Sequence, residues 1–540
     1  MRSKYLFFSI ILISCWYSST ASAQSFEEYK RQQQAKYNSY VQKKTEEYRA
    51  YRDRVNAEYA DFMRRAWKQE EVQPAKPLPQ RPEPPKPEVR KPLDIPQFEA
   101  IPFGDVQAPK VPDIPKPEPI IPIDELDRLV ISAPEELTEE VPTLEPEQEV
   151  QPQPENKPKD EKKPEIKPKD EKKPEAKPKD VKPEGITFLW CGQKWNVPLE
   201  KHHRFRLKSV SENDVADAWQ MLSGAKYAGV VAACLKIRDA YQLPDWGYLR
   251  FLEAMAEAFM PGMQSEARLL EMFILAQSGY QARIARSDGQ LYLLVPSSGD
   301  IFEYSYISLG GRNFYITDNR SRHGSFYIYE RDFPREQPFA WQIRQLPLFS
   351  SNTKTRTLQG QRYPEVRVTV EVSKSLMDFM NGYPRCNNWN LYALASLSEQ
   401  AKKSLYPALW QYIEGKDKKE AVDLLLDFVQ TAFVYQTDNR QFGEERSLFG
   451  DETLYYPYCD CEDRSILFSI LVRELLGLDV VLLNYPNHVA TAVCIGDDVK
   501  GDYVMLDGRR YVVCDPTYIG SYVGEAMPSF NKTKATIIKL

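Results

Sequence analysis

The sequence predicts an α+β protein in which a unit of helices followed by antiparallel strands occurs twice in tandem, behind a long helix and a disordered proline-rich linker. Three observations lead to this fold. Residues 26–67 carry an aromatic repeat with a helical period and contain neither Pro nor Gly. Most of the 41 prolines lie between Pro74 and Pro183. Within residues 186–540, two stretches about 197 positions apart share one helix and strand pattern.

Length and charge restrict the function before any motif is considered. The chain has 540 residues and a formal net charge of -6, with 71 Lys and Arg against 77 Asp and Glu. Proteins that bind nucleic acid usually carry a basic excess. The composition therefore predicts that nucleic acid is not a partner.

Residues 1–23 are predicted to be a signal peptide. Arg2 and Lys4 precede an apolar run over residues 5–13 that is too short to span a bilayer. Cleavage after the Ala-Ser-Ala sequence gives a soluble exported protein, whereas the residues before Cys15 resemble a lipobox and would make Cys15 a lipidated first residue. We expect export to the periplasm, the cell envelope or the medium, with membrane anchoring only through a lipid on Cys15.

A long helix is predicted over residues 24–72. Pairs of aromatic residues recur every 11 positions, and 11 residues complete three turns at about 3.67 residues per turn, so the pairs share one face. The pairs are Phe26 and Tyr29, Tyr37 and Tyr40, Tyr48 and Tyr51, and Tyr59 and Phe62. Two interpretations remain open. The stripe packs on itself or on a second copy, giving self-association through residues 26–67, or it docks another envelope component.

Residues 73–185 are predicted to be a disordered linker. Prolines alternate there with Lys, Glu and Asp, and a ten-residue unit that begins Lys-Pro-Lys-Asp repeats near the end of the segment. Mixed charge and proline disfavour a packed core and favour extended polyproline conformations. We expect this segment to act as a spacer.

The remaining chain divides into two copies, residues 186–345 and residues 346–540. A turn and strand over residues 309–318 match another over residues 506–515, and in both copies an apolar helix that ends at a glycine precedes them. Matches in the same order favour a duplication over chance similarity.

The second copy carries reactive residue types where chemistry could use them. Cys461 begins a predicted helix, where free N–H groups and the helix dipole favour a thiolate. His488 opens a strand after a Pro-Asn break, and Asp515 ends another strand. The histidine can act as the base for the thiol, and the carboxylate can orient the imidazole. Glu462 opposes a thiolate, so activation requires the positive partner that His488 supplies.

This order of residues resembles the transglutaminase-like superfamily of papain-like cysteine enzymes. The resemblance rests on Cys461-Glu462-Asp463 at a helix start, His488 at a strand start and Asp515-Pro516-Thr517 at a strand end, and it is clear over about residues 428–518. It implies a papain/transglutaminase-like core, in which N-terminal helices pack on an antiparallel sheet. It also implies a catalytic triad of Cys461, His488 and Asp515. One departure is Cys459, where the family usually has a small residue.

The resemblance does not assign the oxyanion donor to one position. Gln441, Tyr456 and Tyr458 are candidates that would act beside the N–H of Cys461. We expect no metal and no cofactor, because Cys459 and Cys461 lack a second pair at ligand spacing and no Walker-type phosphate loop occurs.

The first copy is predicted to be a degenerate, inactive domain. Ser265 stands at the cysteine position, the strand at residues 291–295 has no histidine, and only Asp318 remains. The predicted function is therefore carried by the second copy. It is an exported cysteine-dependent amide hydrolase, a peptidase or amidase acting through a thioester on a protein, peptide or peptidoglycan substrate. The alternatives are a cross-linking transglutaminase and a non-enzymatic envelope adaptor.

Overall fold

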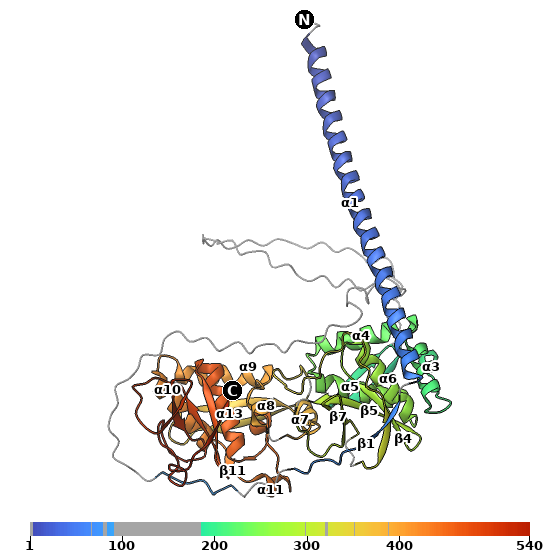
Figure 1. The fold of residues 1–540 in the computed structure, drawn as a ribbon. Helices are drawn as coiled ribbons and strands as arrows, with labels where there is room; N and C mark the ends of the chain where they lie inside the picture. Colours follow the sequence, from blue (N-terminus) through green and yellow to red (C-terminus); the bar gives the residue numbers. More distant parts are fainter. Residues whose placement is uncertain are drawn as a thin grey trace, which may run out of the picture.

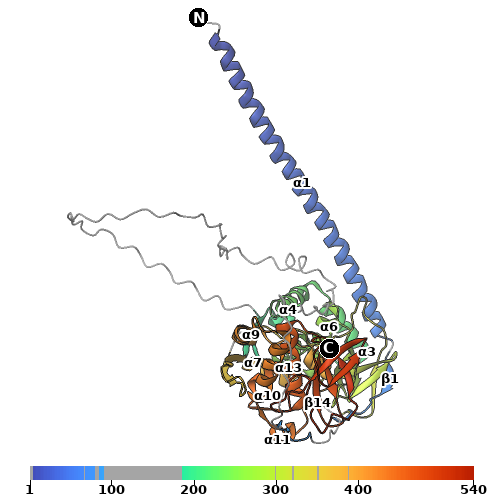
Figure 2. The same ribbon diagram turned by 90° about the vertical axis from the view of Figure 1, so that its left-hand side faces the viewer.

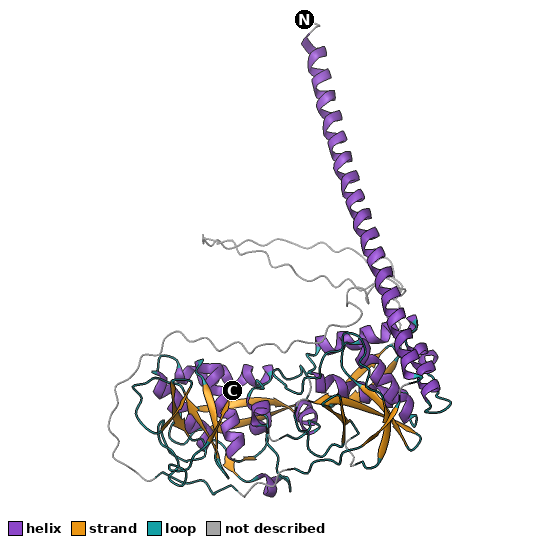
Figure 3. Cartoon of the chain, viewed as in Figure 1, coloured by secondary structure: helices purple, strands orange, loops and turns teal. Residues whose placement is uncertain are grey.

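The structure, a computed structural model, describes residues 4–65, 67–78, 84–90, 185–297, 299–318, 322–349, 352–386 and 388–540, with side chains from residue 28 onward. The predicted α+β class is confirmed: the fold combines a long N-terminal helix, further helices and antiparallel sheets (Figures 1 and 3). The side chains of the predicted signal peptide, including Cys15, and linker residues 91–184 lie outside the described residues.

Helix α1 (Lys4–Met63) projects from the body of the molecule and contacts it only near the C-terminal end of the helix (Figures 1 and 2). Tyr29, Tyr37 and Tyr40 are 57–61% exposed. Tyr59, in contrast, is buried, with its ring 5.1 Å from that of Trp219. The last part of the aromatic stripe therefore packs on the first domain of the same chain, and the earlier part faces solvent.

The predicted boundary between helix and linker needs correction. The helix does not extend to residue 72, because strand β1 (Lys68–Glu71) follows it and pairs with β8 (Ser325–Ile328). Residues 73–78 and 84–90, which we assigned to the disordered linker, also contact the globular part, for example through the bridge of Gln73 to Tyr306. Backbone pairing to a sheet edge thus orders part of a segment whose composition resembles a spacer.

In the first domain, most helices precede the strands of the main sheet. Its elements are β2 (Ile186–Trp190), β3 (Gln193–Val197), η1 (Lys201–His203), α3 (Glu212–Leu222), η2 (Ala225–Tyr227), α4 (Ala228–Ala240), α5 (Asp245–Phe259), α6 (Gln264–Gln277), β4 (Arg283–Ser287), β5 (Gln290–Ser297), β6 (Tyr306–Leu309), β7 (Arg312–Ile316) and β8. Helix α6 packs on β5 and on α5, so its N-terminal end lies beside the start of β5.

The second domain repeats this plan with an insertion. Its elements are β9 (Thr353–Gln359), β10 (Arg367–Ser373), α7 (Lys374–Asn381), α8 (Trp389–Ala393), α9 (Glu399–Ile413), α10 (Lys418–Thr431), β11 (Val434–Tyr435), α11 (Asp438–Gln441), α12 (Gly450–Tyr455), β12 (Tyr458–Cys459), α13 (Cys461–Leu476), β13 (Val480–Asn484), β14 (Val489–Val493), β15 (Tyr503–Leu506), β16 (Arg509–Cys514) and β17 (Thr536–Lys539). Helix α13 packs on α10 and on β14, as α6 does on α5 and β5.

The two sheets share one strand order. The first runs β8-β4-β5-β7-β6, with β1 added at its edge, and the second runs β17-β13-β14-β16-β15. All their pairs are antiparallel, and one hairpin repeats in register: Leu309 faces Arg312 in the first copy, and Leu506 faces Arg509 in the second. The same topology therefore occurs twice in the chain.

The two domains pack on one another through a single large hydrophobic core. The indole N–H of Trp246 in α5 donates to the carbonyl of Gly382 at 3.0 Å, and the ring of Trp190 lies 6.4 Å from that of Phe379. Aromatic side chains thus contact one another across the boundary between the domains. Within the described part of the chain, no helix combines the length and apolarity that crossing a bilayer requires.

Candidate functional site

Cys461 is the first residue of α13, and β12 leads directly into it. The parallel pairing of Tyr435 with Cys459 fixes this approach. The side chain is 3% exposed, and the N–H of Val489 hydrogen-bonds to the sulfur and favours its thiolate form. This contact places the sulfur against the residue that follows His488 in the chain.

His488 and Asp515 form a hydrogen-bonded pair. The imidazole Nε2 lies 2.8 Å from Asp515 Oδ2, and the N–H groups of Thr517 and Tyr518 donate to Asp515 Oδ1. His488 precedes β14 and Asp515 follows β16. Because these adjacent strands are antiparallel, with Thr491 opposite Cys514, the two residues lie at the same end of the strand pair. A proton on Nε2, donated to the carboxylate, leaves Nδ1 as an acceptor.

The other imidazole nitrogen is available for chemistry. His488 Nδ1 is buried, and none of the described residues hydrogen-bonds to it. This is the nitrogen that a neighbouring thiol needs for proton transfer, because Nε2 is already engaged by Asp515. Of the three residues predicted from the sequence, His488 and Asp515 are hydrogen-bonded to one another, and Cys461 contacts Val489, the residue after His488.

Aromatic rings close the site. The ring of Phe530 stacks on His488 at 4.8 Å, and Tyr485 lies parallel to the imidazole at 6.0 Å. His488 and Asp515 are each 1% exposed. Phe530 and Tyr485 therefore cover the imidazole, and the Cys461 thiol is itself buried.

Electrostatics hold the thiol protonated in this closed form. Burial raises the pKa of Cys461 well above its usual range, and the neighbouring Glu462 and Asp460 raise it further. The thiol donates a hydrogen bond to Glu462 Oε2 at 3.2 Å. The helix start alone thus does not yield a thiolate, in agreement with the opposition of Glu462 expected from the sequence.

A buried acidic cluster surrounds the thiol, and the sequence predicts only part of it. Burial and the charges of Asp463 and Glu462 raise the pKa of Asp438 to about 10. Burial and neighbouring carboxylates also raise the pKa of Asp460 and Asp463 well above their usual range. Asp438 lies 23 positions before Cys461 and joins the cluster through the inserted helix α11, so spacing along the chain gives no signal of it.

Asp463 also has a structural role. It accepts hydrogen bonds from the N–H groups of Leu448 and Asp460 and so caps α13. Arg464 does not neutralise the cluster by direct ion pairs, because its guanidinium donates to the carbonyls of Gln430, Phe433 and Pro516. Protons offset the repulsion among the carboxylates, as their raised pKa values indicate.

Donor atoms that could hold a cation also lie in this cluster. Among the described residues, three sets bring their ligand atoms within 4.8 Å of one another: Asp460, Cys461 and Glu462; Asp438, Asp460 and Asp463; Asp438, Glu445 and Glu462. Crowded carboxylates also arise at protonated sites, so we assign no metal to them.

The three oxyanion candidates differ in position. The Tyr456 hydroxyl donates to Asn381, and Tyr458 is 37% exposed. The amide of Gln441 is buried and, among the described residues, has no hydrogen-bond partner at either polar atom. Gln441 ends the short helix α11, whose first residue is the Asp438 of the acidic cluster. It is the candidate with an amide N–H available to an oxyanion.

None of the seven cysteines in the described part of the chain forms a disulfide. Cys459 lies in β12 and is buried, which raises the pKa of its thiol to about 11. Cys514 is fully buried in β16.

The first domain carries different side chains at the corresponding positions. Ser265 Oγ accepts the N–H of Leu291 at 3.1 Å, the same contact that Cys461 makes with Val489. Ser265 thus makes the contact in the first domain that Cys461 makes in the second. Gln290, which precedes Leu291, stands where the second domain has His488. The sequence did not indicate this match, because Gln290 lies about 25 positions after Ser265, whereas His488 lies about 27 after Cys461.

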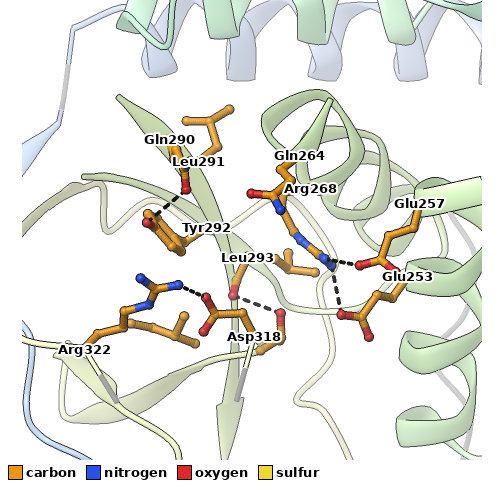
Figure 4. A pocket seen from close by; sticks show the side chains of 12 residues that line it. Glu253, Glu257, Gln264, Arg268, Gln290, Leu291, Tyr292, Leu293, Asp318 and Arg322 are labelled. Carbon is orange, nitrogen blue, oxygen red and sulfur yellow. Dashed lines mark hydrogen bonds and ion pairs between the residues drawn. The ribbon is translucent and has the colours of Figure 1, made fainter. Parts of the chain in front are cut away.

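A pocket of about 250 Å³ lies at this place in the first domain (Figure 4). Asp318, the counterpart of Asp515, forms an ion pair with Arg322 there and does not orient a base. On the other side, Arg268 pairs with Glu257 at 2.8 Å and Glu253 at 3.2 Å. Arginines thus balance the carboxylates of this pocket, whereas protons do so around Cys461.

No protein-family model, no curated protein and no solved structure matches this chain.

Proposed function

We propose that the second domain is a transglutaminase-like cysteine hydrolase that cleaves amide bonds in an exported protein, peptide or peptidoglycan substrate. The single observation that carries this proposal is the buried His488–Asp515 hydrogen bond, which leaves Nδ1 without a partner among the described residues, one residue before the Val489 N–H that contacts Cys461. The order of helices before an antiparallel sheet supports a papain/transglutaminase-like core, and the predicted signal peptide supports export to the periplasm or envelope.

The reaction would begin with proton transfer. The Cys461 thiol turns from Glu462 to His488, whose Nδ1 takes the proton, and the thiolate sulfur attacks the substrate carbonyl carbon. The Cys461 N–H and the Gln441 amide would stabilise the oxyanion. As the C–N bond breaks, the imidazolium returns the proton to the leaving amine, and a thioester remains.

Water completes hydrolysis. His488 takes a proton from the water, the oxygen attacks the thioester carbon, and the C–S bond breaks to release the carboxylic acid and restore the thiol. Asp515 orients the imidazole and stabilises its charged form throughout. An amine in place of water would give transglutamination, but no feature of the site selects an amine acceptor.

Activity of matched variants tests the proposal. The purified chain is assayed on peptide and muropeptide libraries, and Cys461→Ala is compared with Cys459→Ser, which changes a buried thiol two residues away. We expect turnover in the wild type and in Cys459→Ser, and none in Cys461→Ala. Full turnover in Cys461→Ala would refute the assignment.

One observation favours the adaptor function as a second candidate. The raised pKa of the Cys461 thiol and its burial are also what a structural cysteine shows. Iodoacetamide labelling followed by mass spectrometry separates the two functions. Selective alkylation of Cys461 at pH 6–7 once the site is opened supports the hydrolase, and alkylation no faster than that of free cysteine supports the adaptor.

A further inference from the structure

Residues 84–90 lie on the second domain in an extended conformation, as a strap (Figure 1, the short blue stretch beneath that domain). Val89 pairs with Ile519 in a parallel bridge. The N–H of Arg90 donates to the Ile519 carbonyl at 2.9 Å, and the N–H of Ile519 donates to the Glu88 carbonyl at 2.9 Å. These backbone contacts are those by which an extended peptide adds to an exposed strand or loop.

Side chains of the strap give this contact its specificity. Arg90 donates two hydrogen bonds to Glu525, at 2.7 and 2.9 Å, and its guanidinium stacks over the Tyr522 ring at 5.1 Å. The Arg90 side chain is 9% exposed, so the ion pair is largely withdrawn from water. Glu88 accepts a hydrogen bond from the Ser529 hydroxyl. In contrast, Lys86 and Val89 point into solvent.

The strap contacts segments that lie close in the chain, or in the fold, to each of the three candidate catalytic residues. Pro85 accepts a hydrogen bond from the Tyr435 hydroxyl at 3.3 Å, and Tyr435 pairs with Cys459, two residues before Cys461. Ile519 lies four residues after Asp515. Ser529 precedes Phe530, the residue that stacks on His488.

We propose that residues 84–90 occupy, in cis, the surface on which the second domain binds an extended, proline-containing peptide with a buried arginine. This surface consists of Tyr435, Ile519, Tyr522, Glu525 and Ser529. The strap thereby holds the 519–530 segment over His488 and keeps the site closed. The effect of the strap on catalysis rests on the proposed function, but the binding of the strap to this surface does not.

Two features of the strap fit an exchangeable ligand. Pro84, Pro85 and Pro87 restrict the unbound segment to extended conformations, so binding costs little conformational entropy. The segment is also tethered to the surface it binds, and tethering gives millimolar effective concentrations for short flexible connections. A peptide supplied in trans should therefore bind well only when the strap is weakened.

The experiment uses the full chain with a fluorescent peptide of residues 84–90 as the probe. Arg90→Glu should release the strap, and fluorescence anisotropy should then show peptide binding at least about tenfold tighter than to the wild type. Lys86→Glu changes an exposed charge of the same strap and should behave as the wild type. Arg90→Glu combined with Glu525→Arg should restore the closed form, which also excludes loss of folding as the cause.

Alkylation of Cys461 gives an independent measure of opening. We expect iodoacetamide to label Cys461 at least about tenfold faster in Arg90→Glu than in the wild type, and the charge-swapped double variant to return to the wild-type rate. If the peptide does not bind Arg90→Glu and labelling stays at the wild-type rate, the strap is ordinary packing and the proposal is wrong. If binding and opening occur without turnover on any amide, the strap proposal stands and the proposed hydrolase fails.

Discussion

The two domains share one strand order but treat the same position in opposite ways. At the start of α13 the second domain has Cys461 with a His488–Asp515 pair, whereas at the start of α6 the first domain has Ser265 with Gln290 and an Asp318 bound to Arg322. Both keep the hydrogen bond from the strand N–H to the first-turn side chain. The comparison teaches that the contact holding helix to strand does not itself require a cysteine, and that under the proposed function the chemistry depends on His488.

The largest expected effect separates the domains by activity. Cys461→Ala and His488→Ala should each lower turnover by about 10³-fold or more, because nucleophile and base act as a unit. Ser265→Ala and Gln290→Ala, the matched changes in the first domain, should leave turnover unchanged. Steady-state kinetics on the best amide substrate tests this, and a comparable loss from the first-domain variants would break the distinction between the copies.

The next effect concerns how far the domains depend on each other. Trp246→Ala removes a buried side chain of the shared core, so we expect the free energy of unfolding to fall by about 3–5 kcal/mol. Chemical denaturation should remain one transition in both proteins. Deletion of residues 186–345 should expose apolar surface and cause aggregation. Two separate transitions, or a soluble and active second domain after the deletion, would show that the copies are independent modules.

Both domains have an aspartate at the third position, Asp515 and Asp318, and this shared residue gives a sharper comparison. Asp515→Asn should lower turnover by about 100-fold, because the imidazole loses its orienting partner while the nucleophile remains. Asp318→Asn should leave turnover unchanged and alter stability by less than about 1 kcal/mol, since its ion pair with Arg322 is partly exposed. Thermal melting and kinetics on both variants measure these effects. Equal kinetic losses would give the first domain a catalytic share.

The acidic cluster around Cys461 predicts that the stability of the fold depends on pH. The pKa of Asp438 is raised to about 10 in the fold, so between about pH 4 and pH 10 the folded chain holds a proton that the unfolded chain has lost. Stability from this group is complete below about pH 4 and falls as pH rises. Asp438→Asn should therefore reduce the loss of stability between pH 6 and pH 8 by about 2–3 kcal/mol, at about 1.4 kcal/mol per pH unit for one proton.

Urea unfolding at both pH values measures this change, with the exposed Asp497→Asn as the control. An Asp438→Asn protein with the wild-type pH dependence would mean that the carboxylate is ionised, balanced by a cation and not by a proton.

The smallest effect concerns the helix. Tyr37 and Tyr40 are exposed, so their replacement by Gln should leave the melting temperature unchanged, but we propose that it weakens self-association of the full chain. Tyr59→Gln, on the buried end of the same stripe, should instead destabilise the first domain. Sedimentation velocity over a range of concentrations reports the association. The same oligomer before and after the Tyr37 and Tyr40 changes would favour a docking partner.

Local pattern predicted well the helix and strands that carry the three candidate residues. The Cys461 helix, the His488 strand and the Asp515 strand end carry periodicities and breaks that any short window shows, and the tandem copies follow from their repetition. The aromatic repeat predicted a helix, but not that Tyr59 packs on Trp219, because the partner of a stripe is set by tertiary contacts.

Long-range contacts explain what the sequence did not predict. The acidic cluster joins Asp438 to Asp460 through folding of the inserted segment, and no spacing rule connects them. The strap carries the composition of a spacer, and nothing in that composition indicates that Arg90 pairs with Ile519 and Glu525. The match of Gln290 to His488 was not predicted, because the distance along the chain from the helix start to this residue differs between the copies.

The most direct test of the central claim is the pH dependence of Cys461 alkylation in the strap-released Arg90→Glu protein, with and without His488→Ala. We predict selective labelling of Cys461 over the six other cysteines at pH 6–7, lost when His488 is replaced, because the imidazole takes the thiol proton. Alkylation of Cys461 no faster than that of free cysteine, and unaltered by His488→Ala, would contradict a catalytic pair in the second domain.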